Sequence, residues 1–325
     1  MKLSLGVLDQ SPIPEGQGIG AALRNSIDLA RCVDELGYTR YWLAEHHGAA
    51  SLACASPEAL IGPVAAATRH LRVGSGGVML PHYSPLKVAE TFNMLNALYE
   101  GRIDLGVGRA PGTSGRIAHL LQRDRRYPAV DDFPEQLEEL RSWFANEHPE
   151  VPVHFQSPDL WLLGSSEQSA LWAAQLGLPY AFADFINADG AAAAAWYRAR
   201  FAPSQALEKP RQIVAVSAIC AETDEDALRL SASVRMMLLK LFRGGSVPIP
   251  PVEKAEEFLR LERVPFQVLP VGRRLITGSP AKVRRGLETV AEEYGADEVL
   301  IVTITYDHEA RRKSYELIAR EFGLS

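Results

Sequence analysis

Residues 71–108 read LRVGSGGVMLPHYSPLKVAETFNMLNALYEGRIDLGVG, and this stretch contains one complete strand–helix–strand unit. The apolar, β-branched runs Leu71–Met79 and Arg102–Val107 predict a strand at each end. Between them, the Ser84-Pro85 pair is typical of a helix start, and Gly101 is typical of the residue that follows a helix end. A helix that joins two such strands indicates a βαβ unit with a parallel sheet.

The same alternation of short strands and longer helices continues along the whole chain. Eight strands are predicted, over Leu3–Leu8, Thr39–Ala44, Leu71–Met79, Arg102–Val107, Leu160–Gly164, Tyr180–Phe182, Ile213–Cys220 and Glu298–Ile304. Eight units in 325 residues, about 40 residues each, favour an α/β fold of the (β/α)8 or TIM-barrel type. A doubly wound sheet has the same alternation and is the competing architecture.

One segment, residues 243–277, interrupts this regularity before the last βαβ unit. It begins with the Pro- and Gly-rich run RGGSVPIPP and contains a short helical pattern near Glu253–Glu262. The segment is too short to hold its own core, so we interpret it as an insertion. With Gly244-Gly245 as a hinge, it is a candidate lid. The whole chain, 1–325, is then expected to form a single domain.

Composition excludes several classes of protein. The chain has 34 Lys and Arg against 40 Asp and Glu, and it lacks the basic tract that a nucleic-acid partner would need. Its apolar runs are too short to span a membrane. A signal peptide is not expected, because Asp9 and Pro12 interrupt the apolar stretch near the N-terminus before it is long enough. Cys32, Cys54 and Cys220 show no CxxC spacing, so we expect buried thiols in a cytoplasmic protein.

Glu45-His46-His47 comes directly after the second predicted strand. Barrel enzymes place their catalytic groups at the C-terminal ends of the strands, and a histidine there suits general acid/base chemistry. Because adjacent residues of a strand point to opposite faces, at most one of the two histidines is expected to face the site. Two other interpretations stay open: both are hydrogen-bonded into the barrel rim, or one binds a metal, although no HExxH motif is present.

The fifth predicted strand ends in GSSEQS (164–169), which opens a helix. Serines and free N–H groups at a helix N-terminus can bind an anion, although ordinary capping explains the same residues. Arg109, at the end of the neighbouring strand, could add a guanidinium for a phosphate, or could instead pair with a rim carboxylate such as Glu45.

Four weaker patterns are also present. Gly76-Gly77 inside a strand indicates either a close approach to a ligand or a β-bulge. Residues 277–280 open a helix and are a rival phosphate site, while the glycines of 16–20 only imitate a dinucleotide fingerprint. The basic run 123–126 is either a solvated surface or a clamp on an anionic cofactor.

Taken together, four segments resemble the bacterial luciferase-like, flavin-dependent monooxygenase superfamily: YWLAEHH, RVGSGGVMLPHYSPLKVAE, EGRIDLGVGRAPG and WLLGSSEQSALWAAQLGLPYAFA. The resemblance runs from Met1 to about Asn187 and resumes at ITGSP and the last strand. It implies a homodimeric (β/α)8 barrel that binds FMN at the C-terminal ends of its strands. It also implies a separate NAD(P)H-dependent flavin reductase as partner. In such enzymes reduced FMN reacts with O2 to give a flavin C4a-hydroperoxide, and the resemblance implies that this species would oxygenate a small organic substrate.

The resemblance also implies roles for individual residues. His46 matches the active-site histidine, and Gly76-Gly77 matches a non-proline cis peptide against which the flavin ring lies. The phosphate of FMN is expected at Arg109 and at the helix start formed by Gly164, Ser165, Ser166 and Ser169, and not at the loop around Gly278.

Departures from the luciferase pattern limit what the resemblance implies. Gly48, Gly108 and Ser165 replace an aromatic residue, a thiol and a carboxylate of the light-emitting subunit, so light emission and a long-chain aldehyde substrate are not expected. Three alternatives stay open. They are an F420-dependent enzyme that transfers hydride on the same fold, a barrel that binds flavin without turnover, and a metal-dependent hydrolase.

Overall fold

The computed structural model describes residues 3–113, 115–126, 131–150, 154–265 and 269–324. Its strands are β1 (Ser4–Asp9), β2 (Arg40–Leu43), β3 (Arg72–Met79), β4 (Ile103–Gly108), β5 (Asp159–Gly164), β6 (Tyr180–Ala183), β7 (Gln212–Cys220), β8 (Leu275–Gly278) and β9 (Glu298–Val302). Its helices are α1 (Ile19–Glu35), α2 (Pro57–Ala67), the 3-10 helix η1 (Leu80–His82), α3 (Pro85–Leu98), α4 (Gly115–Leu120), α5 (Phe133–Phe144), α6 (Glu167–Gln175), α7 (Ala191–Ala199), α8 (Asp224–Leu230), α9 (Ala232–Phe242), α10 (Val252–Leu261), α11 (Pro280–Tyr294) and α12 (His308–Phe322).

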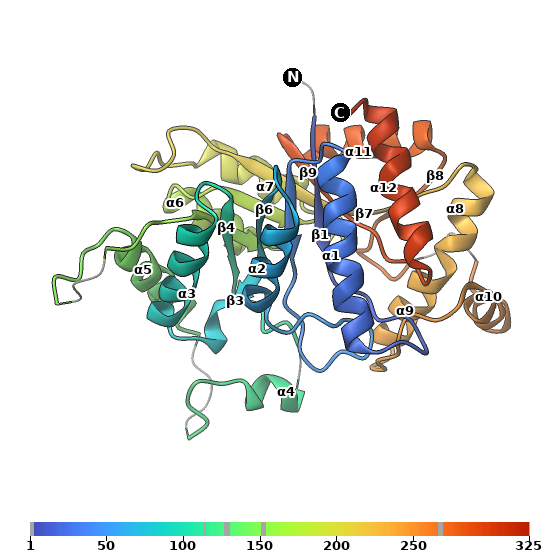
Figure 1. The fold of residues 1–325 in the computed structure, drawn as a ribbon, viewed down its shortest axis with the longest axis horizontal. Coiled ribbons are helices and arrows are strands. Elements are labelled where there is room, and N and C mark those ends of the chain that lie inside the picture. Colours follow the sequence, from blue (N-terminus) through green and yellow to red (C-terminus); the bar gives the residue numbers. More distant parts are fainter. Residues whose placement is uncertain (1–2, 114, 127–130, 151–153, 266–268, 325) are drawn as a thin grey trace.

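Eight of these strands form a closed parallel barrel surrounded by helices (Figure 1). They pair in the order β1–β2–β3–β4–β5–β6–β7–β9, and β9 pairs with both β7 and β1, which closes the ring. In Figure 1 the N-terminus lies at the top, and α4, which follows the C-terminal end of β4, lies at the bottom. The predicted (β/α)8 barrel is confirmed, and the doubly wound sheet, which leaves two open edges, is wrong.

The ninth strand, β8, was not predicted. It pairs with Ser217–Cys220 of β7, whereas β6 pairs with the preceding residues of β7 up to Ala215. It therefore extends the sheet beyond the end of β6. Its four residues lie at the end of the insertion, which they leave at Gly278, and they are too few to show a strand periodicity.

Alternating side chains divide each barrel strand between two clusters. Leu5 and Val7 of β1 belong to the large core between the strands and the outer helices. Leu8 instead belongs to an inner cluster that also contains Trp42 and Trp161. This period of two places every second residue inside the barrel, as parallel strands covered by helices require.

Most helix boundaries follow their sequence signals. The helix start predicted at Ser84-Pro85 is confirmed, and the same Ser-Pro pair begins α2 at Pro57 and α11 at Pro280, although none of these serines makes a side-chain capping bond. Gly101, predicted to follow a helix end, has a positive φ, as do Gly37, Gly177 and Gly295 after other helices. The apolar pattern of Glu225–Phe242 is typical of one continuous helix, but the structure has two, since α8 and α9 meet at Ser231. The hydroxyl of Ser231 donates to the Leu228 carbonyl at 2.6 Å, inside the α8 turn.

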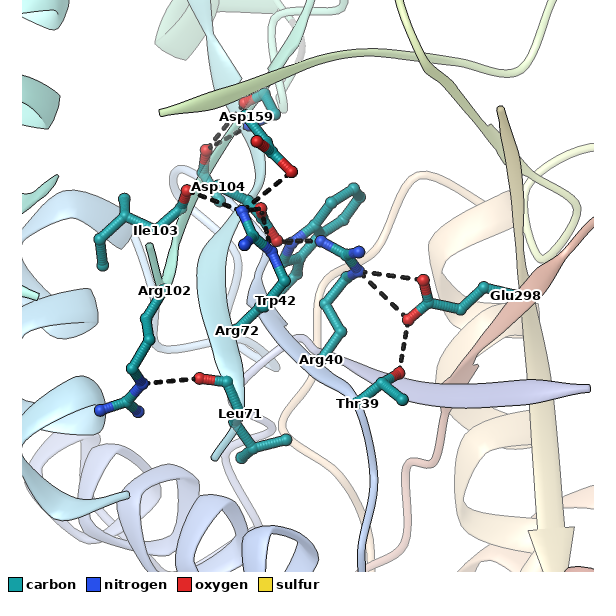
Figure 2. Close-up of polar contacts among 12 residues, drawn as sticks. Thr39, Arg40, Trp42, Leu71, Arg72, Arg102, Ile103, Asp104, Asp159 and Glu298 are labelled. Carbon is teal, nitrogen blue, oxygen red and sulfur yellow. Dashed lines mark hydrogen bonds and ion pairs between the residues drawn. The ribbon is translucent and has the colours of Figure 1, made fainter. Parts of the chain in front are cut away.

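A network of ion pairs, buried around Arg40 and partly exposed around Arg72, lies at the N-terminal end of the barrel (Figure 2). Arg40, Arg72, Asp159 and Glu298 are the first residues of β2, β3, β5 and β9. Arg40, 2% exposed, pairs with Glu298 at 3.1 Å and with Asp104 of β4. Arg72 pairs with Asp104 at 2.6 Å and with Asp159 at 3.0 Å. Each carboxylate is thus matched by a guanidinium, as buried charges require.

The 243–277 insertion is attached to loops at the opposite, C-terminal end of the barrel. Ile249 donates its N–H to the Ile13 carbonyl at 2.8 Å, and Ser246 accepts from the Ala50 N–H at 2.8 Å. The helical piece expected near Glu253–Glu262 is confirmed as α10, which packs on α8 and α9. Its function as a lid and the single-domain organisation stay predictions.

The three cysteines, Cys32, Cys54 and Cys220, are free and buried, as predicted. Within the described ranges, no helix combines the length and the apolar character that a membrane crossing demands.

Candidate functional site

A cavity of about 260 Å³ opens at the C-terminal ends of the barrel strands. Every barrel strand contributes to its wall, through Leu8, Trp42, Gly77, Gly108, Leu163, Ala181, Ala215 and Leu300. All eight site residues singled out from the sequence line it: His46, Gly76, Gly77, Arg109, Gly164, Ser165, Ser166 and Ser169. The rest of the wall is almost entirely apolar, so the polar groups are few and concentrated.

The two adjacent histidines have separate environments. His46 lines the cavity, whereas the His47 Nε2 atom lies 2.6 Å from Oε1 of the fully buried Glu45. Glu45 also accepts hydrogen bonds from the Met79 N–H at 2.9 Å and the Tyr83 hydroxyl at 2.8 Å. Of the two histidines only His46 lines the cavity, in keeping with the prediction, but both follow the end of β2 at Leu43, so the alternation of a strand is not the cause. Sequence reasoning missed that Glu45 fixes the loops on either side of His46.

His46 is a neutral side chain with a free nitrogen. Burial, with a smaller contribution from the neighbouring His47, lowers the pKa of His46 from its ordinary 6.5 to about 4. Its Nδ1 atom is buried and makes no hydrogen bond among the described residues. A buried polar atom without a partner is costly unless a ligand or water completes it, so His46 is poised to exchange a hydrogen bond with a bound molecule.

The peptide bond between Gly76 and Gly77 is cis, as the resemblance implied. The pairing of β3 with β4 also shifts register between Gly76 and Val78, so the bulge expected as the alternative is present at the same place. A Cβ atom on Gly77 would lie 2.7 Å from the Gly106 carbonyl oxygen. Only glycine fits here, and the backbone itself forms this part of the cavity wall.

The N-terminus of α6 forms the polar side of the cavity. Ser166 is the N-cap residue and its hydroxyl accepts from the Ser169 N–H at 3.4 Å. The Ser169 hydroxyl lies 2.9 Å from that of Tyr180. A Cβ on Gly164 would approach the Ser169 Oγ to 2.1 Å, so this position also requires glycine. Ordinary capping is therefore present, and the N-terminus of α6 lies at the cavity through Ser165, Ser166 and Ser169.

Arg109 reaches the rim from the end of β4. Its side chain is 47% exposed and pairs with Asp131 at 3.1 Å, while its guanidinium carbon lies 5.4 Å from the centre of the Trp172 ring. The alternative interpretation, a salt bridge to a carboxylate, is thus present, although its partner is Asp131 and not Glu45, whose carboxylate makes the contacts described above. An exposed ion pair of this kind contributes little to stability and leaves the guanidinium available to an incoming anion.

The apolar walls were not predicted from the sequence. Trp172 and Phe133 come from α6 and α5, and Phe185 and Ile186 follow β6. Trp42 stands on the cavity floor, where its Nε1 donates to Asp104 of the ion-pair network at 2.9 Å. The closed barrel brings these distant residues together, and no local pattern marks them.

The rival anion sites are occupied by carboxylates. At the 277–280 loop, the Ser279 N–H donates to Asp224 at 2.7 Å. In the basic run, Arg123 pairs with Asp132 and Arg126 with Asp124. Among the residues that the structure describes, no group of three or more His, Cys, Asp or Glu side chains is placed to hold a metal.

Known proteins resemble this chain over almost its whole length. A family model described as luciferase-like monooxygenase matches residues 3–298. An Escherichia coli K12 protein named luciferase-like monooxygenase is 43% identical, covering 97% of this chain and 96% of the relative. The N-acetyl-S-alkylcysteine monooxygenase of Bacillus subtilis is 35% identical, covering 98% of this chain and 97% of the relative.

Solved structures share the fold along the whole chain. The crystal structure of apo-MsnO8 is 40% identical with a TM-score of 0.90, and 99% of each chain is covered. Two more distant structures match at TM-scores of 0.76 and 0.68, with 19% and 15% identity and 97–99% coverage of each chain. They are the oxygenating constituent of 3,6-diketocamphane monooxygenase from Pseudomonas putida in complex with FMN, and an F420-dependent secondary alcohol dehydrogenase. This chain belongs to the luciferase-like monooxygenase family of oxidoreductases.

Proposed function

We propose that the protein is an FMN-dependent monooxygenase that uses reduced flavin and O2 to oxygenate a small organic substrate. One observation carries the proposal: three features meet in one apolar cavity. Arg109 and the N-terminus of α6 form its rim, and the backbone of Gly76-Gly77 forms part of its wall. The third feature is the neutral His46, whose Nδ1 has no hydrogen-bond partner among the described residues. The diketocamphane enzyme solved with FMN has the same fold, which supports FMN as the cofactor. Bound reduced FMN would supply the electrons that activate O2.

The phosphate end of FMN would be held at the rim. The N–H groups at the start of α6 and the hydroxyls of Ser165 and Ser166 supply neutral donors, and the helix dipole favours an anion there. Arg109 adds a planar guanidinium that can bind two phosphate oxygens at once. Trp172, against which that guanidinium is stacked, keeps it directed along the rim.

The ring end would lie deeper, along the Gly76-Gly77 backbone. The absence of side chains at these two positions lets a flat ring approach the wall closely. Leu8, Trp42 and Leu300 close the floor beneath it with apolar surface. Such walls exclude water from the reacting atoms and so limit unproductive side reactions.

His46 would hold or move a proton beside the reacting atoms. Because its pKa is about 4, the ring is neutral at physiological pH and can accept a hydrogen bond at one nitrogen while it donates from the other. A neutral imidazole suits general acid/base catalysis of this kind.

The named B. subtilis relative suggests a first substrate class to test. That protein is an N-acetyl-S-alkylcysteine monooxygenase, and at 35% identity a thioether is a reasonable substrate class for this chain as well. A separate NAD(P)H-dependent flavin reductase, a homodimer and a cytoplasmic location remain predictions alongside this one.

The alternative with a specific observation in its favour is an F420-dependent hydride transfer, because an F420-dependent alcohol dehydrogenase shares the fold. The decisive experiment titrates the purified protein with oxidised FMN, photoreduced FMN and F420, and then mixes each complex with O2 in a stopped-flow spectrometer. Preferred binding of reduced FMN and an oxygen-dependent absorbance transient are expected. Binding of F420 alone would establish the alternative, and flavin binding without any turnover would indicate a non-catalytic barrel.

A further inference from the structure

Arg273 and Arg274 are adjacent cations with opposite surroundings. Arg274 pairs with Asp184 at 3.3 Å and with Glu293 at 2.8 Å. Arg273 makes one described hydrogen bond, from Nη1 to the Phe185 carbonyl oxygen at 2.9 Å, and its guanidinium carbon lies 5.7 Å from the centre of the Phe242 ring. Among the described residues, no carboxylate lies within ion-pair distance of Arg273.

This guanidinium adjoins the mouth of the cavity. Phe185, whose carbonyl oxygen it binds, lines the cavity, and so does Ile186, which is 44% exposed. The chain before Arg273 is attached to the same loop, because the Ala188 N–H donates to the Gly272 carbonyl at 2.9 Å. Arg273 therefore lies against the loop that follows β6, and Phe185 and Ile186 of that loop line the cavity.

A half-buried guanidinium without a countercharge is unusual. Burial lowers the pKa of Arg273, and no carboxylate opposes that effect. Buried charges in proteins are normally paired, and an arginine has five N–H donors in a fork that matches a carboxylate. The neighbouring Arg274 differs, because Asp184, which follows β6, and Glu293 of α11 each supply it with a carboxylate.

We propose that Arg273 binds a carboxylate carried by the organic substrate, whose apolar part occupies the adjoining cavity. The proposal rests on the proposed function and narrows its substrate class to organic acids with an apolar body. The wall chemistry agrees, because Arg109 is the cation that lines the cavity itself, and the apolar residues Phe185 and Ile186 lie on the side where Arg273 is found. An apolar wall with a cation beside it fits a molecule with an apolar body and one charged end.

The test uses three probe pairs, each a carboxylate and its methyl ester: 3-(benzylthio)propanoate, octanoate and phenylacetate. Calorimetric titration of the full chain, alone and saturated with oxidised FMN, measures binding without turnover. For at least one pair, the wild type is expected to bind the carboxylate about tenfold more tightly than the ester, as a charge-assisted hydrogen bond predicts. Arg273→Gln is expected to reduce that preference to about twofold or less.

Two further variants separate the cause from general effects. Lys240→Gln removes one positive charge from α9, the helix that carries Phe242, and is expected to keep the preference. Arg273→Lys keeps the positive charge but loses the planar guanidinium, and it is expected to retain part of the preference for the carboxylate over the ester. If Arg273→Gln does not fold, the Lys variant alone tests whether Arg273 causes that preference. An unchanged preference in Arg273→Gln and Arg273→Lys, or no preference in the wild type for any pair, would overturn the proposal.

The flavin phosphate is the competing anion, and FMN titration distinguishes it. Arg273→Gln is expected to leave FMN affinity within about twofold, while Arg109→Gln weakens it. Equal weakening by both would assign Arg273 to the flavin and overturn the proposal. If the wild type binds no FMN but keeps its carboxylate preference, the proposed function fails while the inference about Arg273 stands.

Discussion

The two ends of the barrel use polar residues in opposite ways. At the N-terminal end, Arg40, Asp104 and Glu298 are buried and mutually paired, and none faces a cavity wall (Figure 2). At the C-terminal end, Nδ1 of His46 has no partner among the described residues and Arg109 is half exposed. The ion-pair network at the first end is satisfied within the protein, whereas His46 and Arg109 at the other end are left to be completed by a ligand. This division is the one expected of a barrel enzyme.

The largest effect is expected from breaking the satisfied end. Arg40→Met removes the cation between two buried carboxylates, Asp104 and Glu298, and is expected to cost about 3–5 kcal/mol of unfolding free energy. Urea denaturation followed by circular dichroism measures it. Lys87→Met, which breaks an exposed pair with Glu90, is the control and is expected to cost under about 0.5 kcal/mol. Equal, small losses in both variants would mean that the network does not stabilise the fold.

The next effect concerns the unsatisfied end. His46→Ala is expected to lower the rate of coupled substrate oxygenation at least about 100-fold, the usual contribution of a proton-transferring group. Stability is expected to be little changed or raised, since an unpartnered buried nitrogen is lost. Product formation per O2 consumed measures the first effect and urea denaturation the second. Intact coupled oxygenation in the variant would remove His46 from the mechanism.

The strands and the site motifs were predictable because their signals are local. The Glu45-His46-His47 and 164–169 segments lie at strand ends that short apolar runs define, and the closed barrel brings these ends together. The partners of these groups were not predictable. Arg40 meets Glu298 across 258 positions of sequence, and Trp172 lies 63 positions beyond Arg109. Ring closure alone creates such contacts, and a single sequence carries no periodicity for them.

The third prediction uses the depressed pKa of His46. Between about pH 6.5 and pH 4 the unfolded state binds a proton at His46 that the folded state does not. The contribution of His46 to the free energy of unfolding is therefore complete above about pH 6.5 and is lost as the pH falls to about 4. The loss attributable to His46 is expected to be about 2 kcal/mol, allowing for its partial exposure to solvent. The measurement is the difference between wild type and His46→Gln in urea unfolding across this range. A difference that does not vary with pH would show that His46 keeps an ordinary pKa.

The smallest effect sharpens the comparison at the rim itself. Arg109→Gln is expected to weaken FMN binding about tenfold, because a charge-assisted contact to phosphate is lost while the helix N-terminus remains. Arg123→Gln, in the same loop and paired with Asp132, is the matched control, and its FMN affinity is expected to stay within about twofold. Fluorescence titration of FMN measures both affinities.

An equal loss of FMN affinity in the two variants would mean that the whole basic loop attracts the phosphate by its net charge. A loss that vanishes at high salt would support the same conclusion. A loss confined to Arg109 that persists in salt would instead locate the phosphate at the rim beside α6, because a direct contact is screened much less than a long-range attraction.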